Sequence, residues 1–234
     1  RDLHSFPTRR SSDLCACSFG DSAFKKWCQG KEVQHALKQK RLEEIQKSLA
    51  FSNIPQKWRE SSLESLEGHE NLKQKINMYL DHFQEHRKHG KGIYLWAGHD
   101  PEKKTTRVLS IICREVINRF IVPCIFMTEQ DILRKIQESF RNPETSEYEC
   151  LKRFRSIPCL FIDGFMSGRI TPWRTEILSD ILDHRFDNAL PTFFSSPHRP
   201  EDDCRNQVCS AETFSRIKGM CADFILEIPF SNVN

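Results

Sequence analysis

The sequence lacks an apolar run of the length that a membrane-spanning helix requires, which is roughly 18–20 residues. It also lacks a strong excess of either charge, since 35 Lys and Arg residues stand against 32 Asp and Glu residues. This balance predicts no general attraction to nucleic acid, so any nucleic-acid surface has to be local. No secretory signal peptide is recognisable. We therefore expect a cytoplasmic protein.

The ten cysteines do not show the spacing of a disulfide framework. Several lie within apolar runs, so we expect them to be reduced and mostly buried, as small hydrophobic residues of a cytoplasmic protein. Cys15, Cys17 and Cys28 would form part of a tetrahedral set of zinc ligands, to which His35 would add a fourth. Their irregular spacing favours an ordinary solvated helix at His35 over a zinc site.

The N-terminal part of the chain divides into two segments. Residues 1–14 fit nothing that follows, and His4 to Leu14 resemble the translation of a widely used DNA-sequencing adapter. We interpret them as an assembly artefact, with a short disordered leader as the alternative, and exclude them from the fold. Residues 15–52 are predicted to be largely helical, because apolar residues recur at helical spacing from 31 to 50. This helix either packs on its own domain or binds a partner.

One stretch predicts a strand, a polar loop and the start of a helix. Ile93 to Ala97 have the length and aromatic content of a buried strand, which breaks at Gly98. Lys104, Thr105 and Thr106 then open an apolar-periodic helix. This is the layout of a phosphate-binding loop, G-x-x-x-x-G-K-[ST], in which backbone amides face the phosphates, the Lys neutralises their charge and the hydroxyl holds Mg²⁺.

Lys103 occupies the place of the second glycine of this pattern. A non-glycine residue at positive φ costs roughly 1–2 kcal/mol, and its side chain can crowd a phosphate that approaches the backbone. The stretch is therefore a divergent phosphate-binding loop. A chance Lys-Thr pair at the start of a helix is the alternative.

Apolar strand-like runs alternate with helical patterns through the rest of the chain. After a connector that begins at residue 53, helices are predicted from the apolar periodicity of 72–83, 104–117, 131–140, the region of Leu151 and Phe154, and 173–186, with a turn at 86–91. Buried strands are predicted at 93–97, 123–128, 159–163, 192–196 and 224–228. This alternation predicts an α/β domain over 53–234, in which helices flank a mostly parallel five-stranded sheet.

Asp163 closes the third of these apolar runs, which is the Walker B form. Such a strand places a carboxylate at the C-terminal edge of the sheet, where it can hold the Mg²⁺ that Thr105 also binds. An Asp that caps the following helix is the alternative. The presence of a phosphate-binding loop earlier in the chain favours a P-loop NTPase.

Several segments in order resemble the bacterial DnaC/DnaI replicative-helicase loaders, with the IstB-type transposition helpers as close relatives. They include NIPQKW, KGIYLWAG, CLFIDGF and FSRIKGMCADFILE, and the resemblance covers residues 53–228. It implies an AAA+ ATPase core that binds ATP or ADP, preceded by a small region that contacts a replicative DNA helicase. Lys104 and Thr105 would be the Walker A pair, and Asp163 the Walker B carboxylate for Mg²⁺.

The resemblance implies two further sites. Arg216 sits where these loaders carry an arginine finger, which reaches the nucleotide of a neighbouring subunit and implies self-association. An ordinary surface arginine is the alternative. Phe140 and Arg141, with Asn142, fall in the helical insertion that the family uses near single-stranded DNA. An aromatic ring beside an Arg can stack a base and neutralise a phosphate, whereas a buried Phe140 is the alternative.

Three departures from the family pattern fall on its chemistry. Besides Lys103, Gly164 stands where relatives have a second acid that orients the attacking water, and Pro197 stands where they have a sensor Asn. Loss of such positioning groups commonly costs orders of magnitude in rate, so weak or absent hydrolysis is expected. The sequence thus predicts an ATP-binding, helicase-loader-like protein of DNA replication. The alternatives are a catalytically degenerate pseudo-ATPase adaptor and an IstB-like transposition helper.

Overall fold

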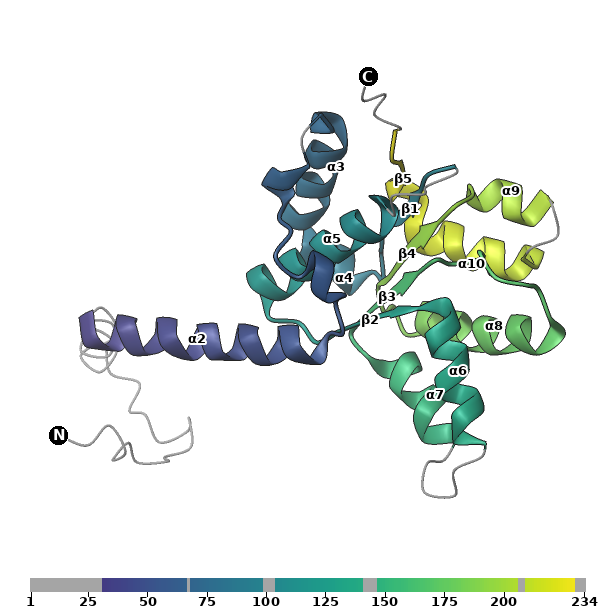
Figure 1. Cartoon of the computed structure of the whole chain (residues 1–234), viewed down its shortest axis with the longest axis horizontal. Coiled ribbons are helices and arrows are strands. Elements are labelled where there is room, and N and C mark those ends of the chain that lie inside the picture. Colours follow the sequence, from purple (N-terminus) through teal and green to yellow (C-terminus); the bar gives the residue numbers. More distant parts are fainter. Residues whose placement is uncertain (1–30, 67, 99–103, 141–146, 206–208, 230–234) are drawn as a thin grey trace, which may run out of the picture. The chain divides into compact units, whose positions relative to one another are not determined.

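The computed structural model describes residues 31–66, 68–98, 104–140, 147–205 and 209–229 (Figure 1). The chain divides into two compact units, residues 1–46 and 47–234. Helix α2 (Lys31–Phe51) begins in the first unit and ends in the second, which confirms the predicted helix. Its sequence is rich in Lys, Gln, Glu, Leu and Ala, which are strong helix formers. Cys15, Cys17 and Cys28 lie outside the described residues.

The larger unit contains a five-stranded sheet with the strand order β2-β3-β4-β1-β5. Each neighbouring pair of strands is parallel, which confirms the predicted parallel α/β architecture. The strands are β1 (Tyr94–Trp96), β2 (Cys124–Thr128), β3 (Cys159–Asp163), β4 (Thr192–Ser196) and β5 (Ile225–Glu227). Because the strands are parallel, their C-terminal ends meet at one edge of the sheet, where a ligand site is expected.

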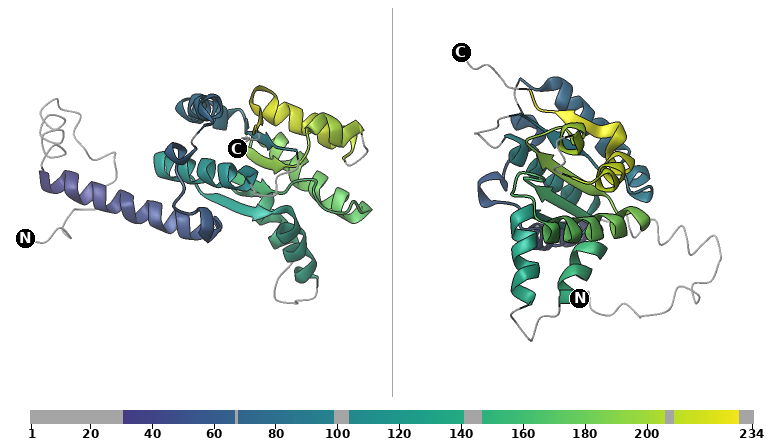
Figure 2. Two further views of the ribbon diagram at one scale, coloured as in Figure 1. Left: turned by 45° about the horizontal axis from the view of Figure 1, so that its top comes forward. Right: turned by 90° about the vertical axis from the view of Figure 1, so that its right-hand side faces the viewer.

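Helices cover both faces of this sheet (Figures 1 and 2). On one face lie α3 (Glu70–Asp81), α4 (Phe83–Lys88) and α5 (Lys104–Phe120). On the other face lie α6 (Glu129–Ser139), α7 (Glu147–Ser156), α8 (Pro172–Asp187) and α10 (Ala211–Cys221), and the short helix α9 (Pro200–Arg205) follows β4. Single turns of 3₁₀ helix occur at Gln56–Trp58, Leu63–Ser65 and Ala222–Phe224. The predicted turn at 86–91 is wrong in its first half, because α4 continues to Lys88.

The core consists of apolar strand residues that pack against the helices of both layers. Phe161 and Phe193, on neighbouring strands, stack with their ring centroids 4.2 Å apart, and Tyr79 of α3 meets Phe193 edge-on. Seven cysteines lie among the described residues, and all seven are free thiols. Five of them are buried, and Cys150 and Cys204 are partly buried, in agreement with the expectation of reduced, mostly buried cysteines.

Local capping signals explain where the helices after β2 and β3 begin. Thr128, the last residue of β2, accepts a hydrogen bond from the Asp131 amide and so caps α6. Thr171 caps α8 in the same way, and Pro172 occupies the first helical position, where its missing N–H costs nothing. None of the described helices is long and apolar enough to cross a membrane.

Candidate functional site

The carboxylate of Asp163 lies at the C-terminal end of β3 and accepts hydrogen bonds from two hydroxyl groups. Thr106 Oγ1 of α5 lies 2.9 Å from Asp163 Oδ1 and 3.1 Å from Oδ2. Ser195 Oγ of β4 lies 2.5 Å from Oδ1. Asp163 is only 8% exposed, and Ser195 is buried. The carboxylate is therefore fixed between the first turn of α5 and the neighbouring strand.

The turn that follows β3 is fastened to the same strand. Gly164 donates its backbone N–H to Ser195 Oγ at 3.0 Å, and Phe165 donates its N–H to the Ser195 carbonyl at 2.7 Å. Gly164 has a φ of +65°, a left-handed conformation that glycine adopts without steric cost. This geometry gives a physical reason for glycine at the place of the expected second acid.

A cavity of about 410 Å³ opens at this edge of the sheet. Of the predicted site residues that the structure describes, Gly98, Thr105, Thr106 and Asp163 line it. Gly164, Ser195 and Pro197 also line it. The structure thus brings together the end of β1, the start of α5 and the ends of β3 and β4, as expected for a nucleotide site in a parallel sheet.

Lys104 is the first residue of α5 and is partly buried. The first turn of α5 contains no acidic residue, so nothing in it opposes the partial positive charge of the helix N-terminus. An anion in the adjacent cavity would meet this partial charge. Lys104 itself is not among the described residues that line the cavity. Lys103 lies outside the described residues.

A buried ion pair lies next to this cavity, because Thr128 and Gln130, the sequence neighbours of Glu129, line it. Glu129 at the start of α6 and Arg174 in the first turn of α8 are 1% and 3% exposed, and Arg174 Nε lies 2.5 Å from Glu129 Oε1. The other carboxylate oxygen of Glu129 accepts the backbone N–H of Met166 at 2.7 Å. The loop between β3 and α8 is thereby tied to α6.

Comparison with known proteins finds one protein with a similar sequence and several solved structures with a similar fold. No model of a known protein family matches the chain. The replicative helicase loader DnaI of Bacillus subtilis (strain 168) is 31% identical over 114 residues, which are 48% of this chain and 35% of DnaI. The chain therefore matches about a third of the length of this curated relative.

Solved structures share the fold over a larger part of the chain. The DnaC helicase loader is 17% identical with a TM-score of 0.64, covering 74% of this chain and 99% of the DnaC chain. The replication initiator DnaA, bound to AMPPCP and single-stranded DNA, is 15% identical with a TM-score of 0.61, covering 77% of this chain and 52% of the DnaA chain. The chain shares the α/β fold of these DnaC and DnaA structures. This confirms the AAA+ fold that the sequence predicted.

The donor groups around Asp163 fit a magnesium ion that is bound together with a phosphate. They comprise one carboxylate and the hydroxyls of Thr105 and Thr106, all of them hard oxygen ligands. Mg²⁺ typically takes one or two protein carboxylates and completes its octahedron with water and substrate phosphates. No cluster of three or more His, Cys, Asp or Glu side chains suited to a metal occurs in the described parts of the chain.

Arg216 does not line the Asp163 cavity. It lies on α10, where its Nε donates a hydrogen bond to Asp183 Oδ1 at 2.8 Å and its guanidinium lies over the Phe186 ring at 5.1 Å. Both partners belong to α8, and about a third of the Arg216 side chain is exposed. A role at the nucleotide of another subunit therefore stays a prediction.

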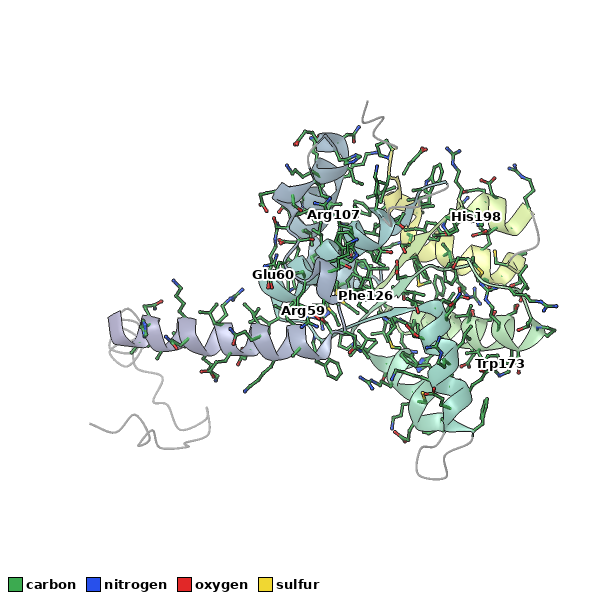
Figure 3. All side chains as sticks on the ribbon, viewed as in Figure 1. Arg59, Glu60, Arg107, Phe126, Trp173 and His198 are labelled. Carbon is green, nitrogen blue, oxygen red and sulfur yellow. The ribbon has the colours of Figure 1, made fainter. Side chains whose placement is uncertain are left out.

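Phe140 follows the last residue of α6 and is 52% exposed, so the alternative of a buried Phe140 is wrong. Its ring meets that of Trp173 edge-on, with the centroids 6.3 Å apart. Trp173 is labelled in Figure 3 and lies in the first turn of α8. Arg141 and Asn142 lie outside the described residues. An exposed Phe140 beside a partly buried Trp173 thus occurs where the sequence predicted a single aromatic residue.

Sequence reasoning did not assign roles to Ser195, Glu129 or Arg174. A polar residue at the end of a strand was the available signal for Ser195, but using it required knowing that β4 lies beside β3. Glu129 and Arg174 had no signal, because each stands in the first turn of a helix, where charged residues are usually exposed.

A second titratable pair lies in the segment that follows β4. His198 Nδ1 is 3.0 Å from Asp203 Oδ1, and Asp203 is almost fully buried although His198 is half exposed. Burial raises the pKa of the Asp203 carboxyl to about 6, and the neighbouring His198 opposes this shift in part. The other oxygen, Asp203 Oδ2, is buried and has no hydrogen-bond partner among the described residues.

Proposed function

We propose that this chain binds ATP or ADP together with Mg²⁺ and is a helicase-loader-like protein of DNA replication. The observation that carries the proposal is the Asp163 carboxylate, held by Thr106 and Ser195 in a cavity beside the N-terminus of α5. The similarity to DnaI and DnaC supports the loader assignment. The AMPPCP bound to DnaA supports a nucleotide as the ligand.

Each predicted site residue takes a role that its position allows. Lys104, at the start of α5, would neutralise the phosphates, and the N-terminal amides of the helix would bind their oxygens. Asp163 and the hydroxyl of Thr105 would hold Mg²⁺, which supplies charge neutralisation at the phosphates when bound. Thr106 would keep the carboxylate in place. Gly98 would let the backbone approach the ligand closely.

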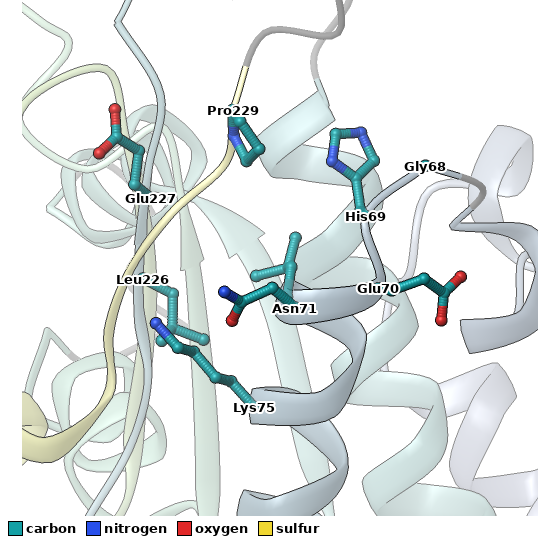
Figure 4. Close-up of a pocket in the computed structure, with 9 residues that line it drawn as sticks. Gly68, His69, Glu70, Asn71, Lys75, Leu226, Glu227 and Pro229 are labelled. Carbon is teal, nitrogen blue, oxygen red and sulfur yellow. The ribbon is translucent and has the colours of Figure 1, made fainter.

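A second cavity, of about 290 Å³, offers room for the base of the nucleotide (Figure 4). Gly68, just before α3, and Asn71 and Lys75 of α3 line one side, and Leu226 and Glu227 of β5 line the other. Since β5 pairs with β1, this cavity lies beside the strand that leads into the phosphate-binding loop. A nucleotide would therefore place its phosphates near Asp163 and its base near Leu226.

We propose that the chain binds the nucleotide but hydrolyses it very slowly or not at all. Gly164 and Pro197 line the Asp163 cavity but bring neither a carboxylate to orient water nor an amide to contact the terminal phosphate. Without such groups the chemical step loses most of its acceleration. This observation also favours a second candidate function, that of an adaptor which binds a nucleotide without hydrolysing it.

The proposal includes three macromolecular contacts. A replicative DNA helicase would bind the N-terminal region at 15–52, of which α2 carries the exposed apolar residues Leu37 and Leu42. Single-stranded DNA would stack on the exposed ring of Phe140, beside the partly buried Trp173, because exposed aromatic rings accept bases of any sequence. Copies of the chain would meet through Arg216. The similarity to helicase loaders supports the first contact, and the bound single-stranded DNA of DnaA supports the second.

A binding titration tests the nucleotide site. The full chain is titrated with a fluorescent ADP or ATP analogue, with Mg²⁺ and with a chelator, beside the variants Lys104→Ala and Lys152→Ala. Lys152 is an exposed control on α7. We expect saturable binding that Lys104→Ala weakens at least about tenfold, as for a lost charge-assisted hydrogen bond, and that Lys152→Ala leaves unchanged. No binding by the folded chain, or equal binding by both variants, would refute the nucleotide site.

Association with a helicase is tested separately. The chain is immobilised and exposed to the replicative helicase of the same source, with ATP, with ADP and without nucleotide. Retention of the helicase under at least one condition is expected, and retention under none refutes the loader assignment. A chain that binds nucleotide but never the helicase would be an ATP-binding protein of another role.

A further inference from the structure

Arg199 contacts Trp96 and Glu227, of which Glu227 lines the second cavity, and takes no part in the site described above. It follows β4, and its guanidinium carbon lies 4.3 Å from the centroid of the Trp96 ring. Its terminal nitrogen lies 3.5 Å from Glu227 Oε2. Trp96 is the last residue of β1 and pairs with Glu227, the last residue of β5. The arginine thus sits over the C-terminal ends of both strands.

The neighbours of Arg199 place it beside the path that the phosphates would take. Pro197, two residues before it, lines the Asp163 cavity. Glu227 lines the second cavity, and Figure 4 shows its carboxylate pointing away from Asn71 and Lys75. Trp96 stands two residues before Gly98, where the phosphate-binding loop begins. His198, the residue before Arg199, is labelled in Figure 3.

The contacts of Arg199 hold it only weakly. Its side chain is 53% exposed and that of Glu227 is 55% exposed, and exposed ion pairs contribute little to stability. A guanidinium binds phosphate with two parallel hydrogen bonds, which are stronger than a long contact to an exposed carboxylate. A phosphate group at the end of β1 would therefore compete well with Glu227 for this arginine.

We propose that Arg199 is a phosphate contact that the chain supplies to its own nucleotide, and that Glu227 holds it over Trp96 when no nucleotide is bound. The ligand class is a nucleoside diphosphate or triphosphate. This inference rests on the proposed nucleotide site. It means that the Arg199 guanidinium would bind the nucleotide of its own chain. Arg216, in contrast, was expected to act on the nucleotide of a neighbouring subunit.

The test compares ligands with and without phosphates. ATP, ADP and adenosine are titrated into the full chain and into Arg199→Ala, Arg199→Lys and Arg205→Ala, the last being an exposed control on α9. We expect Arg199→Ala to weaken ATP and ADP binding about 10- to 100-fold, as for a lost hydrogen-bonded charge. Adenosine binding is expected to stay unchanged. Arg199→Lys keeps the positive charge but cannot form the two parallel hydrogen bonds of a guanidinium, so its loss of ATP and ADP affinity is expected to be smaller. Arg205→Ala is expected to bind all three ligands as the unchanged chain does.

Glu227→Gln is an independent test, because this substitution is expected to raise the nucleotide affinity that Arg199→Ala lowers. Removing the carboxylate frees Arg199 and removes a repulsive charge, so ATP and ADP should bind a few-fold more tightly. If the gain acts through Arg199, it is smaller when Glu227→Gln is combined with Arg199→Ala, as a double-mutant cycle measures. Thermal unfolding without nucleotide shows that each variant is folded.

The outcomes separate this inference from the proposed nucleotide site. An unchanged chain that binds no nucleotide refutes both. Nucleotide binding that Arg199→Ala leaves intact refutes the role of Arg199 alone. An equal loss of ATP and adenosine binding, with a lowered melting temperature, would mean that Arg199 only packs on Trp96. Selective loss of ATP and ADP binding, together with a coupled gain in Glu227→Gln, supports the phosphate contact.

Discussion

Ser195 Oγ lies 2.5 Å from Asp163 Oδ1, and the same oxygen of Ser195 accepts the backbone N–H of Gly164 at 3.0 Å. One serine on β4 therefore orients the carboxylate that ends β3 and also fixes the first residue of the turn beyond it. This relationship joins the two strands at the place where a phosphate-bound Mg²⁺ would sit.

Ser195→Ala is predicted to weaken the binding of the Mg²⁺ form of the nucleotide. A hydrogen bond to a charged group contributes about 1.5–3 kcal/mol, so the loss should be at least about tenfold in affinity. The measurement is the ratio of nucleotide affinities with Mg²⁺ and with a chelator. This ratio should fall in Ser195→Ala and stay unchanged in Ser156→Ala, an exposed serine on α7. An equal decrease of the nucleotide affinity with Mg²⁺ and with the chelator would indicate a purely structural role of Ser195.

The buried pair of Glu129 and Arg174 predicts a large loss of stability when one partner is removed. Arg174→Met leaves the Glu129 carboxylate buried without its cation, which costs about 3–5 kcal/mol. Arg155→Met is the matched control, because Arg155 pairs with the partly exposed Asp180 and such pairs contribute at most about 1 kcal/mol. Denaturant unfolding of both variants and of the unchanged chain gives the loss in free energy of unfolding that each substitution causes. Equal effects of the two substitutions would contradict the prediction.

The sequence predicted the sheet well because parallel strands are buried on both faces. Such strands form continuous apolar runs, and the predicted bounds of β3 (Cys159–Asp163) and β4 (Thr192–Ser196) agree with the structure. Helix α9 was not predicted, because Pro200–Arg205 is short, acidic and without apolar periodicity. The second half of α4 was missed for a different reason. His86 stacks on Tyr79 with the rings 4.8 Å apart, and local sequence does not reveal such a tertiary contact.

The candidate site was predictable only where its residues lie in a local motif. Asp163 and Thr105 were predicted as site residues from the pattern around each of them. Ser195, by contrast, reaches Asp163 only because the chain places β4 beside β3, and strand order does not follow from the sequence pattern. Arg199 reaches Glu227 for a similar reason, since β5 pairs with β1.

Asp203 predicts a specific dependence of stability on pH. Its pKa is raised from an ordinary value of 3.8 to about 6, mainly by burial, so the folded state holds its proton more tightly than the unfolded state. This contribution to stability is fully present below about pH 4 and is lost as the pH rises through about 6. His198, Tyr94, Asp202 and Cys209 are the titratable groups that face or adjoin it.

The measurement compares the unchanged chain with Asp203→Asn, which carries no charge at any pH. The difference in the free energy of unfolding between them should change by about 1–3 kcal/mol between about pH 4 and pH 7, in favour of the variant at higher pH. Other carboxylates affect both proteins alike and cancel. A difference that stays constant over this range would show that Asp203 is ionised throughout.

The last prediction concerns Gly164, which stands where the family resemblance led us to expect an acid. Its φ of +65° suits glycine, and a Cβ added there would lie 3.2 Å from Ser167 Oγ. Gly164→Ala should therefore cost about 1–2 kcal/mol of stability. Gly168→Ala is the matched control in the same loop, because its added Cβ would meet its neighbours only at 3.9 Å, an ordinary contact distance. Denaturant unfolding of the two variants should separate them by this amount.

The same backbone conformation limits what an introduced acid can do. Gly164→Glu would restore the expected carboxylate in sequence, but its main chain would have to keep the left-handed conformation or break the hydrogen bond from Gly164 to Ser195. Either change disturbs Asp163, which Ser195 also holds. Gly164→Glu is therefore expected to bind nucleotide no more tightly and to gain no ATP turnover. Measurable turnover that appears in Gly164→Glu would show that the missing acid alone limits hydrolysis.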